Sequence, residues 1–410
     1  MNRRKALKTA IGGLALSFTP WLKAQKQEFE LLGYIRTNWS QDPFSFGSYS
    51  YFAKGSRRRD VRILEKPVGN TLFFAGEATH PDRNSTVHAA HESGLRAADA
   101  IGRTKAKRVA IIGAGMSGLT AASHLPKNDI EVEVFEARDR VGGRIWTDQR
   151  LGAPVDLGAN WIHGTKRNPL TELAKNQDHA FIETDDSYVI RGSDGREMRD
   201  SEAPDWLDNV VNIQHSAGAG IEKINRLAYL ATNDYNGPEV IFPMGYAPLL
   251  DAFKGDYKIN LNTKVEAIRR DGKKVTVSSK PLGDQIFDAV LITVPLGVLK
   301  KGVIKFAPAL PEDKMQAIQK LGMGTLDKLC FLFKSPFWDL DTTWIATPEN
   351  GLPHGQFNQW LNFYKYFEKP LIMAFNGGQP AIDLATLSDE ELVEKALQTI
   401  TTPYQSPNQH

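Results

Sequence analysis

The chain has 410 residues, 41% of them hydrophobic and 24% charged, which is typical of a globular protein with two or three domains. Its 50 lysines and arginines balance 48 aspartates and glutamates, so the net charge is only +2 and no long run of either sign occurs. These values exclude a disordered or fibrous chain and argue against nucleic acid or anionic lipid as a partner. We therefore expect a small-molecule partner.

The first 24 residues have the pattern of a targeting segment. Residues 2–8 are basic, residues 9–22 are mildly apolar and too short to span a bilayer, and small residues permit cleavage after Ala24. The pair Arg3-Arg4 is similar to a bacterial twin-arginine signal, which exports proteins already folded around a cofactor. This predicts export to the bacterial periplasm through that machinery, with no membrane-spanning segment in the mature chain. A Sec signal or a frayed helix is the alternative.

A short polar join leads into the strongest motif. A helix is predicted to end near Ala100, residues 101–107 are polar, and residues 108–112 are predicted to form a buried parallel strand. The sequence GAGMSG follows at 113–118 and opens a helix that runs to Leu125. This order of strand, glycine-rich turn and helix predicts a dinucleotide-binding βαβ unit.

Each glycine of the motif has its own purpose. Gly113 allows the tight turn, Gly115 lets the backbone approach a pyrophosphate, and Gly118 lets helix and strand pack closely. The helix N-terminus adds N–H groups and a positive dipole for the phosphates. A second strand, 131–135, ends in Glu136, whose carboxylate would accept hydrogen bonds from ribose hydroxyls. Strand, helix and terminal acid together favour a dinucleotide site over a simple tight turn.

The next two segments favour FAD over NAD. Residues 137–144 (ARDRVGGR) and 156–164 (DLGANWIHG) resemble motifs of the flavin-containing amine oxidase family, which includes monoamine and polyamine oxidases and the histone lysine demethylases. The resemblance implies that the paired glycines, with Arg138 and Arg144, hold the FAD diphosphate. Without the upstream motif, two arginines beside a Gly-Gly pair would indicate only a solvated turn.

Further matches to the family follow along the chain. Val265, ahead of a hairpin at Asp271-Gly272, resembles the residue whose backbone contacts adenine. Lys328, in the apolar strand 326–333, matches the lysine that holds a water against flavin N5. Because an unpaired buried lysine is costly, we expect Lys328 to face a polar cavity. An edge-strand lysine that reaches to solvent is the alternative.

One block of the family pattern lies out of its usual place. Three segments resemble the block that normally closes such a protein: 38–51, 72–79 and 85–98. Here they precede Gly113, while the carboxyl end stops after a helix capped by Ser388, where a family chain would continue into that block. The sequence therefore looks circularly permuted, with an assembly or gene-prediction artefact as the competing account. Permutation costs little stability when the original termini lie close together and the new termini fall in exposed loops. If the chain is permuted, residues 32–35 should lie near Ile400 in space.

The resemblance also assigns roles within this block. Glu77 would bond the ribityl chain, Trp39 would pack on the isoalloxazine, and the Thr86-Val87 backbone would meet the flavin pyrimidine edge at a helix N-terminus. Tyr49 and Thr86 fall where the family places the two walls of an aromatic cage, so only one wall is aromatic here, as in the demethylases.

The predicted site has two groups of residues and no metal. Ser48 stands where covalent members carry a flavin-linked cysteine, so FAD should be bound non-covalently, and His163 resembles the vertebrate polyamine oxidases. The residues expected at the substrate are Lys328, Tyr49, Thr86 and His163. Those expected at the cofactor are Trp39, Gly76, Glu77, Thr86, Val87, Gly113, Gly115, Met116, Ser117, Gly118, Glu136, Ala137, Arg138, Gly143, Arg144, Gly158, Ala159, Asn160, Trp161 and Val265.

The implied fold is two-domain α/β, with a Rossmann-like FAD domain and a mixed-sheet and helix substrate domain, circularly permuted. After the leader, the expected parts are 25–104 (permuted block, with the cage strand and an FAD-binding part), 105–167 and 240–302 (FAD domain), 168–239 and 303–400 (substrate domain) and 401–410 (polar tail).

The implied reaction is FAD-dependent oxidation of a primary or secondary amine, polyamine-like or monoamine. Hydride passes to flavin N5, the imine hydrolyses to an aldehyde, and oxygen reoxidises the flavin to give hydrogen peroxide. Two alternatives remain: a flavin dehydrogenase of the carotene-desaturase or protoporphyrinogen oxidase type, and an FAD-binding protein crippled by the permutation.

Overall fold

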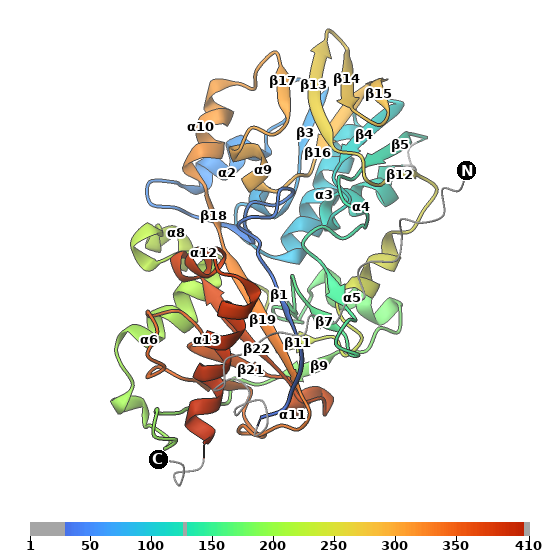
Figure 1. Cartoon of the computed structure of the whole chain (residues 1–410). Helices are drawn as coiled ribbons and strands as arrows, with labels where there is room; N and C mark the ends of the chain where they lie inside the picture. Colours follow the sequence, from blue (N-terminus) through green and yellow to red (C-terminus); the bar gives the residue numbers. More distant parts are fainter. Residues whose placement is uncertain (1–28, 126–128, 406–410) are drawn as a thin grey trace, which may run out of the picture.

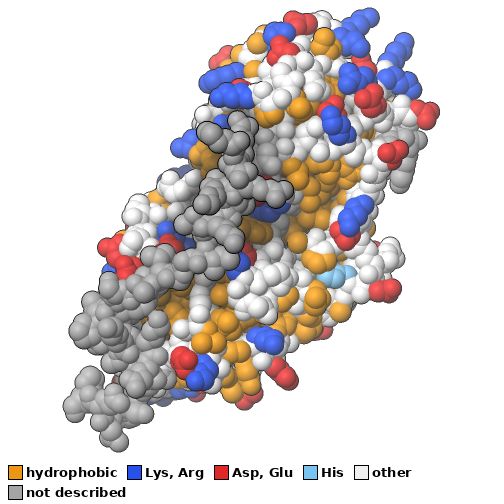
Figure 2. Space-filling model, turned by 45° about the vertical axis from the view of Figure 1, so that its right-hand side comes forward, with side chains coloured by type: hydrophobic (Ala, Val, Ile, Leu, Met, Phe, Trp, Pro, Cys, Tyr) orange, Lys and Arg blue, Asp and Glu red, His pale blue; other side chains and the backbone are white. Residues whose placement is uncertain are grey.

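The computed structural model describes residues 29–125 and 129–405, so the leader predicted at 1–24 lies outside the described residues. Figure 1 shows two stacked parts: a dinucleotide part built on a parallel sheet, and a mixed-sheet part below it. Charged side chains of both signs are dispersed over the face seen in Figure 2, in keeping with the small net charge. Within the described ranges, no helix is long and apolar enough to cross a membrane.

A five-stranded parallel sheet forms the centre of the dinucleotide part. In spatial order its strands are β12 (Lys258–Asn260), β5 (Glu131–Phe135), β4 (Arg108–Ile112), β16 (Ala289–Ile292) and β3 (Leu72–Phe74). The strands predicted at 108–112 and 131–135 are confirmed to the residue, because their apolar runs are buried on both faces of the sheet. β3 comes from the block that precedes the glycine motif, and it completes this sheet.

The two faces of the sheet are covered differently. Val109 and Ile111 pack on one face with α3 (Val87–Gly102) and α4 (Met116–His124). Ala110 and Ile112 pack on the other face with α2 (Arg58–Glu65). This alternation is the two-residue period of a strand that is buried on both sides.

A second sheet and two helices complete the dinucleotide part, and the last strand and last helix of this group lie beyond its predicted end at residue 302. The four strands are β15 (Gly283–Phe287), β14 (Lys274–Ser279), β13 (Val265–Asp271) and β17 (Lys305–Ala307), followed by α10 (Glu312–Lys320), with α9 (Leu296–Lys300) before β17. The hairpin predicted at Asp271-Gly272 joins β13 to β14. Ile304 and Ile318 belong to the core that includes Val61 of α2, so the burial of these side chains places residues 304–321 in the dinucleotide part.

The mixed-sheet part is built on six strands. Their order is β1 (Leu31–Arg36), β19 (Leu326–Phe333), β22 (Leu371–Gly377), β21 (Gln359–Asn362), β20 (Trp344–Ala346) and β10 (Tyr188–Ile190), antiparallel except for β10 beside β20. α12 (Gln379–Leu384) and α13 (Asp389–Thr401) follow β22, and Ser388 caps α13 with Glu391 as predicted. The apolar strand predicted at 326–333 is confirmed as β19.

Shorter elements surround the junction of the two parts. The strands are β2 (Tyr49–Tyr51) paired with β18 (Gly322–Gly324), β6 (Thr147–Asp148) paired with β7 (Val155–Asp156), and a three-stranded sheet of β8 (Trp161–Ile162), β11 (Glu239–Ile241) and β9 (Ile182–Thr184). The helices are α5 (Pro169–Asn176), α6 (Trp206–Asp208), a π-helical stretch at Asn209–Gln214, α7 (His215–Ala217), α8 (Arg226–Leu230) and α11 (Tyr364–Phe367).

The two ends of the described chain meet in the mixed-sheet part (Figure 1). The ring centroids of Phe29 and Tyr404 lie 4.4 and 5.8 Å from that of Phe337. Ile400 shares this core with Phe29 and Tyr34, which confirms the predicted proximity of residues 32–35 to Ile400. Residues 401–405 are not a loose polar tail, because 402–404 form a 3-10 helix whose apolar side chains pack here.

Candidate active site

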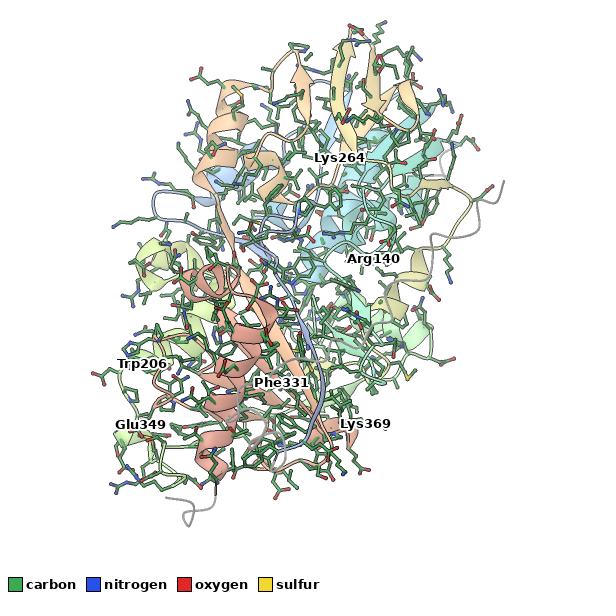
Figure 3. All side chains as sticks on the ribbon, viewed as in Figure 1. Arg140, Trp206, Lys264, Phe331, Glu349 and Lys369 are labelled. Carbon is green, nitrogen blue, oxygen red and sulfur yellow. The ribbon has the colours of Figure 1, made fainter. Side chains whose placement is uncertain are left out.

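A cavity of about 650 Å³ runs between the dinucleotide part and the mixed-sheet part. It is lined by the carboxyl ends of the parallel strands, by β19 and β22, and by the β8–β11–β9 sheet. In Figure 3, Lys264 and Arg140 are labelled in the dinucleotide part and Phe331 in the mixed-sheet part. A cleft at the carboxyl ends of parallel strands is the usual ligand site of such a sheet.

The structure brings the predicted site residues to this one cavity although they are spread along the chain from Trp39 to Lys328. All four predicted substrate residues line it, and so do all predicted cofactor residues except Gly118. Gly118 has the packing purpose predicted for it, because a Cβ there would lie 2.0 Å from the carbonyl oxygen of Gly113. The placement is thus established, while the role of each residue stays a prediction.

The start of α4 fits a diphosphate. Its N-cap residue, Gly115, has no side chain to cap the helix, and Gly115, Met116 and Ser117 all line the cavity. Gly143 closes on this turn so tightly that a Cβ would lie 3.3 Å from the Cα of Gly115. An uncapped helix N-terminus bordered by bare backbone is a ready site for phosphate oxygens, so the residues present fit the FAD that the sequence predicts.

Both arginines predicted at the diphosphate are held by acids of the block that precedes the glycine motif. Arg138 forms two hydrogen bonds with Asp42, at 2.9 and 2.8 Å. Arg144 donates to Glu77 at 2.9 Å and to the carbonyl of Ser48 at 2.9 Å. These partly buried ion pairs fix the guanidinium groups at the cavity wall and tie residues 29–104 to the dinucleotide part. The pairing with Asp42 was not predicted from the sequence, which offers no local signal for it.

Glu136 and Glu77 organise the turns around them. Glu136 is 5% exposed and accepts hydrogen bonds from the backbone N–H groups of Ala114 and Arg138. Besides Arg144, Glu77 accepts hydrogen bonds from the Ser50 hydroxyl and the Ser85 N–H. Each carboxylate therefore shapes the cavity wall before any ligand binds.

The N-terminus of α3 faces the cavity as predicted. Thr86 is its N-cap, accepting a hydrogen bond from the Ala89 N–H and donating one to the carbonyl of Arg83. The Thr86 hydroxyl is thus occupied by the helix cap, and Thr86 and Val87 present the start of the helix to the cavity. Such an end stabilises negative charge placed before it.

Lys328 is buried in the cavity wall, so the alternative of an edge-strand lysine reaching to solvent is wrong. β19 lies between β1 and β22, and Lys328 is only 5% exposed. Its ammonium donates to the carbonyls of Asp156 and Gly158 and to the side-chain oxygen of Asn160. Burial lowers the pKa of Lys328, opposed by the charge of Asp156, and burial raises the pKa of the Asp156 carboxyl.

Aromatic side chains line the cavity beside Lys328. Trp161 stacks on Trp344 at 5.8 Å, and both approach Phe375, at 6.2 and 5.7 Å. The Phe375 ring centroid lies 5.6 Å from the Lys328 nitrogen, and Tyr49 lines the same space. Of these, Trp344 and Phe375 escaped the sequence analysis because β20 and β22 carry no motif. Aromatic faces of this kind attract a cationic amine.

Acidic groups gather at the three-stranded sheet. Four carboxylates on or beside its strands line the cavity: Asp185, Asp186, Asp234 and Glu239. They outnumber the three basic groups beside them, because Lys365 bonds Asp185, His163 lies 2.5 Å from Glu239 and His88 lies 3.9 Å from Asp234. Burial opposes a charge on His163, but the hydrogen bond and charge of Glu239 outweigh it and raise the pKa of His163. This acidic rim suits a ligand with positive charge.

Comparison with known proteins gives concordant matches. A family model described as flavin containing amine oxidoreductase matches residues 17–102, 116–213 and 226–409. The chain is 30% identical over 346 residues to polyamine oxidase 5 of Oryza sativa subsp. japonica, covering 70% of each protein. It is 29% identical over 363 residues to the lysine-specific histone demethylase 1 homolog 3 of Oryza sativa subsp. indica, covering 74% of this chain and 44% of that protein. A solved putrescine oxidase double mutant superposes with a TM-score of 0.54 at 21% identity, over 72% of this chain and 81% of the other, and so shares the fold.

Proposed function

The chain belongs to the flavin containing amine oxidoreductase family and is an FAD-dependent amine oxidase, and from this premise we propose that its substrate is a polyamine-like amine with more than one positive charge. FAD, when bound, accepts a hydride from the carbon that bears the amine. The rivals weighed from the sequence, a desaturase-type dehydrogenase and a crippled flavin protein, have no observation in their favour here.

The observation that carries the proposal is the composition of the cavity along its length. Near Lys328 the walls are aromatic, with Tyr49, Trp344 and Phe375. At the β8–β11–β9 sheet the wall is acidic. An extended polycation can place one amine between the aromatic rings and another at the acidic rim, whereas a monoamine gains nothing from the rim.

The protein's own contribution is orientation, exclusion of water and control of charge. The α4 N-terminus and the arginines Arg138 and Arg144 would hold the FAD diphosphate, and the α3 N-terminus would face the flavin ring. Trp39, buried and fixed by a hydrogen bond from its indole N–H to the Leu157 carbonyl, supports the wall. Lys328 fixes its amino group at the cavity wall through its bonds to Asp156, Gly158 and Asn160.

The test is anaerobic reduction of the purified, FAD-loaded protein, followed through the flavin absorption. Spermidine and octylamine have chains of similar length but differ in the number of charges, so they isolate the effect of the rim. We expect spermidine to bleach the flavin at concentrations at least about tenfold lower than octylamine does, and Asp234→Asn to narrow that gap.

Two outcomes would overturn these assignments separately. If spermidine and octylamine bleach the flavin at the same concentrations, the polyamine proposal is wrong, although the protein is still an amine oxidase. A yellow protein that no polyamine, aromatic monoamine or L-amino acid bleaches would contradict amine oxidation itself.

We also propose that the chain is a circular permutant of the family order. Three observations support this: β3 of the early block pairs with β16, β1 pairs with β19, and Phe29 and Tyr404 both contact Phe337, where a join would lie. The family model also matches residues 17–102 as a segment separate from 116–213.

We propose, finally, that residues 1–24 direct export of the folded protein to the bacterial periplasm by the twin-arginine machinery. The support is the Arg3-Arg4 pair ahead of a short apolar stretch and a small-residue cleavage site after Ala24. Replacing both arginines by lysine should leave an uncleaved precursor in the cytoplasm of a bacterial host. Unchanged processing and export would point to the Sec route instead.

A further inference from the structure

One lysine of the chain has its ammonium group bound at the acidic rim of the cavity. Lys365, on α11, donates to the Asp185 carboxylate at 2.5 Å, to the Ser187 hydroxyl at 2.8 Å and to the Thr343 hydroxyl at 3.3 Å. Its three N–H donors therefore meet three oxygen atoms of the protein. The same three oxygens suit the ammonium group of any primary amine, and we call them the Lys365 site.

Hydrogen bonds that do not involve the lysine hold the Lys365 site in shape. The second oxygen of Asp185 accepts from the Ser187 N–H at 3.0 Å and from the Thr343 hydroxyl at 2.5 Å, and the Asp185 N–H donates to the Tyr366 hydroxyl at 3.2 Å. Burial would raise the pKa of Asp185, but the hydrogen bonds from Lys365, Ser187 and Thr343 outweigh it and lower that pKa. The carboxylate is thus fixed and charged, and most of its partners remain if the lysine leaves.

The ion pair in the Lys365 site is open to solvent and to the cavity. Asp185 lines the cavity, and the side chains of Asp185 and Lys365 are 56% and 20% exposed. An ion pair in contact with water contributes little to stability, because water solvates both partners once they separate. The ammonium of Lys365 can therefore turn out to solvent on its flexible stem while another ammonium group takes its place at Asp185.

The Lys365 site adjoins the aromatic end of the cavity on both of its sides. Thr343 is followed directly by Trp344, and Asp185 is preceded directly by Thr184, whose hydroxyl accepts a hydrogen bond from the Trp161 indole N–H at 3.2 Å. The Trp161 and Trp344 rings stack at 5.8 Å and line the cavity. A ligand that places one amine among these rings thus has an ammonium site along the same wall for a second amine.

We propose that the distal ammonium group of a polyamine-like substrate competes with Lys365 for the Lys365 site, so that this lysine limits the affinity of the cavity for polycations. The inference rests on the proposed function and adds a specificity-determining residue to it. The incoming ammonium group takes over the hydrogen bonds of Lys365, which turns to water. An amine with a single charge has no second ammonium group to place there, so its affinity does not depend on Lys365.

The test measures the dissociation constants of spermidine and octylamine by calorimetry on the anaerobic, reduced holoenzyme, in which no amine can be oxidised. Lys365→Met removes the ammonium group and keeps an unbranched side chain. Adding Ser187→Ala removes one acceptor of the Lys365 site without changing any charge. Lys258→Met is the matched control, because Lys258 pairs with Glu133 at 2.8 Å and both residues lie outside the cavity lining.

For Lys365→Met we expect the dissociation constant of spermidine to fall about fivefold while that of octylamine changes less than about twofold. The double variant with Ser187→Ala should lose much of this gain, and Lys258→Met should show none. Unchanged or weaker spermidine binding in folded Lys365→Met with full FAD content would overturn the proposal. So would an undiminished gain in the double variant, which would indicate only the long-range effect of the lost charge. If Lys365→Met does not fold, Lys365→Gln decides by the same comparison.

The failure of this inference is distinguishable from failure of the proposed function. If the wild type binds spermidine more tightly than octylamine while Lys365→Met leaves both dissociation constants unchanged, the role of Lys365 is wrong and the preference for polyamine-like amines stands. If the wild type binds the two amines equally and Lys365→Met changes neither constant, both proposals are wrong.

Discussion

The ammonium group of Lys328 has three N–H donors, and all three point to oxygen atoms of the protein. Asp156, Gly158 and Asn160 lie in the segment that lines the cavity opposite β19, so the lysine ties the two parts of the wall together. A water beside this lysine must therefore displace one of these acceptors. Burial lowers the pKa of Lys328, so the amine gives up its third proton, and the hydrogen bond that goes with it, more easily than an exposed lysine does.

We predict that Lys328→Met retains FAD but slows flavin reduction by amine or reoxidation by oxygen at least about tenfold, because the group that handles charge at the wall is lost. Stopped-flow measurement of both half-reactions tests this. Lys314→Met is the matched control, since Lys314 is equally buried but donates to the Ile63 and Leu64 carbonyls away from the cavity. Unchanged rates in both half-reactions would refute the role of Lys328.

Residues in contiguous motifs were predictable, and residues that meet only in the folded chain were not. The glycines, Glu136 and Arg144 stand in short segments whose spacing alone indicates their use. His215 and Gln359 lie on a short helix and a short strand without any motif, and only the folded chain brings α7 next to β21 so that they become neighbours.

At the scale of elements, one side chain secures the end of β1 to β19. Asp327 accepts hydrogen bonds through one oxygen from the Thr37 hydroxyl and the Trp39 N–H, at 2.8 and 2.7 Å. Its other oxygen has no partner within the described ranges, and burial raises the pKa of Asp327 to about 6. The junction thus contains a carboxylate that the fold prefers protonated.

We predict that Asp327→Asn becomes more stable relative to the wild type as the pH rises from about 4 to about 6, and that it keeps this gain at higher pH. Between the ordinary aspartate pKa and about 6, the folded wild type binds more protons than the unfolded chain, so its stability falls as the pH rises through this window. Asparagine keeps the accepting oxygen and does not titrate, so this pH-dependent loss of stability is absent from the variant. The difference in Tm between the FAD-loaded variant and the wild type should be a few degrees more favourable at pH 8 than at pH 4.5. An identical difference at both pH values would contradict it.

Elements with a strong local pattern were predictable to the residue, as β4, β5 and β19 show. The end of the dinucleotide part was not, because β17 is only three residues long and its place is decided by pairing with β13. Likewise, the sequence predicts a polar tail at 401–410, whereas 402–404 form a 3-10 helix whose Tyr404 packs on Phe337, a residue distant in sequence.

At the scale of the whole molecule, we expect that the order of the segments can be changed without changing the fold. We predict that a chain running from residue 105 to 405, joined by a short flexible linker to residues 29–104, folds, binds FAD and is reduced by amines at a rate within about tenfold of the original. The physical reason is that Phe29 and Tyr404 already pack on Phe337, so the join crosses little space.

The measurement is FAD content, Tm and the anaerobic reduction rate of both chains. A matched control consists of residues 105–405 followed by the same linker, without residues 29–104. It should not retain FAD, because β3, Trp39 and Glu77 are missing. A rearranged chain that is insoluble or colourless would contradict the prediction.

The family resemblance made the two-part architecture predictable, and it indicated that the block before the glycine motif contributes to the site. What the sequence could not supply was the set of contacts that hold that block, since the Arg138 pair with Asp42 and the Arg144 pair with Glu77 join residues far apart in the chain. Such pairs depend on distance in space, for which a single sequence carries no direct signal.

The pairing of β1 with β19 and of β3 with β16 has a consequence for how a ribosome delivers this protein. Translation starts at the amino end, so β1 and β3 emerge with unpaired edges and stay so until residues 289–292 and 326–333 have been made. Unpaired edges in a nascent chain invite aggregation and favour capture by chaperones. β1 and β3 are therefore made before their partner strands but are secured only after them, and the cofactor can be enclosed only once residues 326–333 have been made.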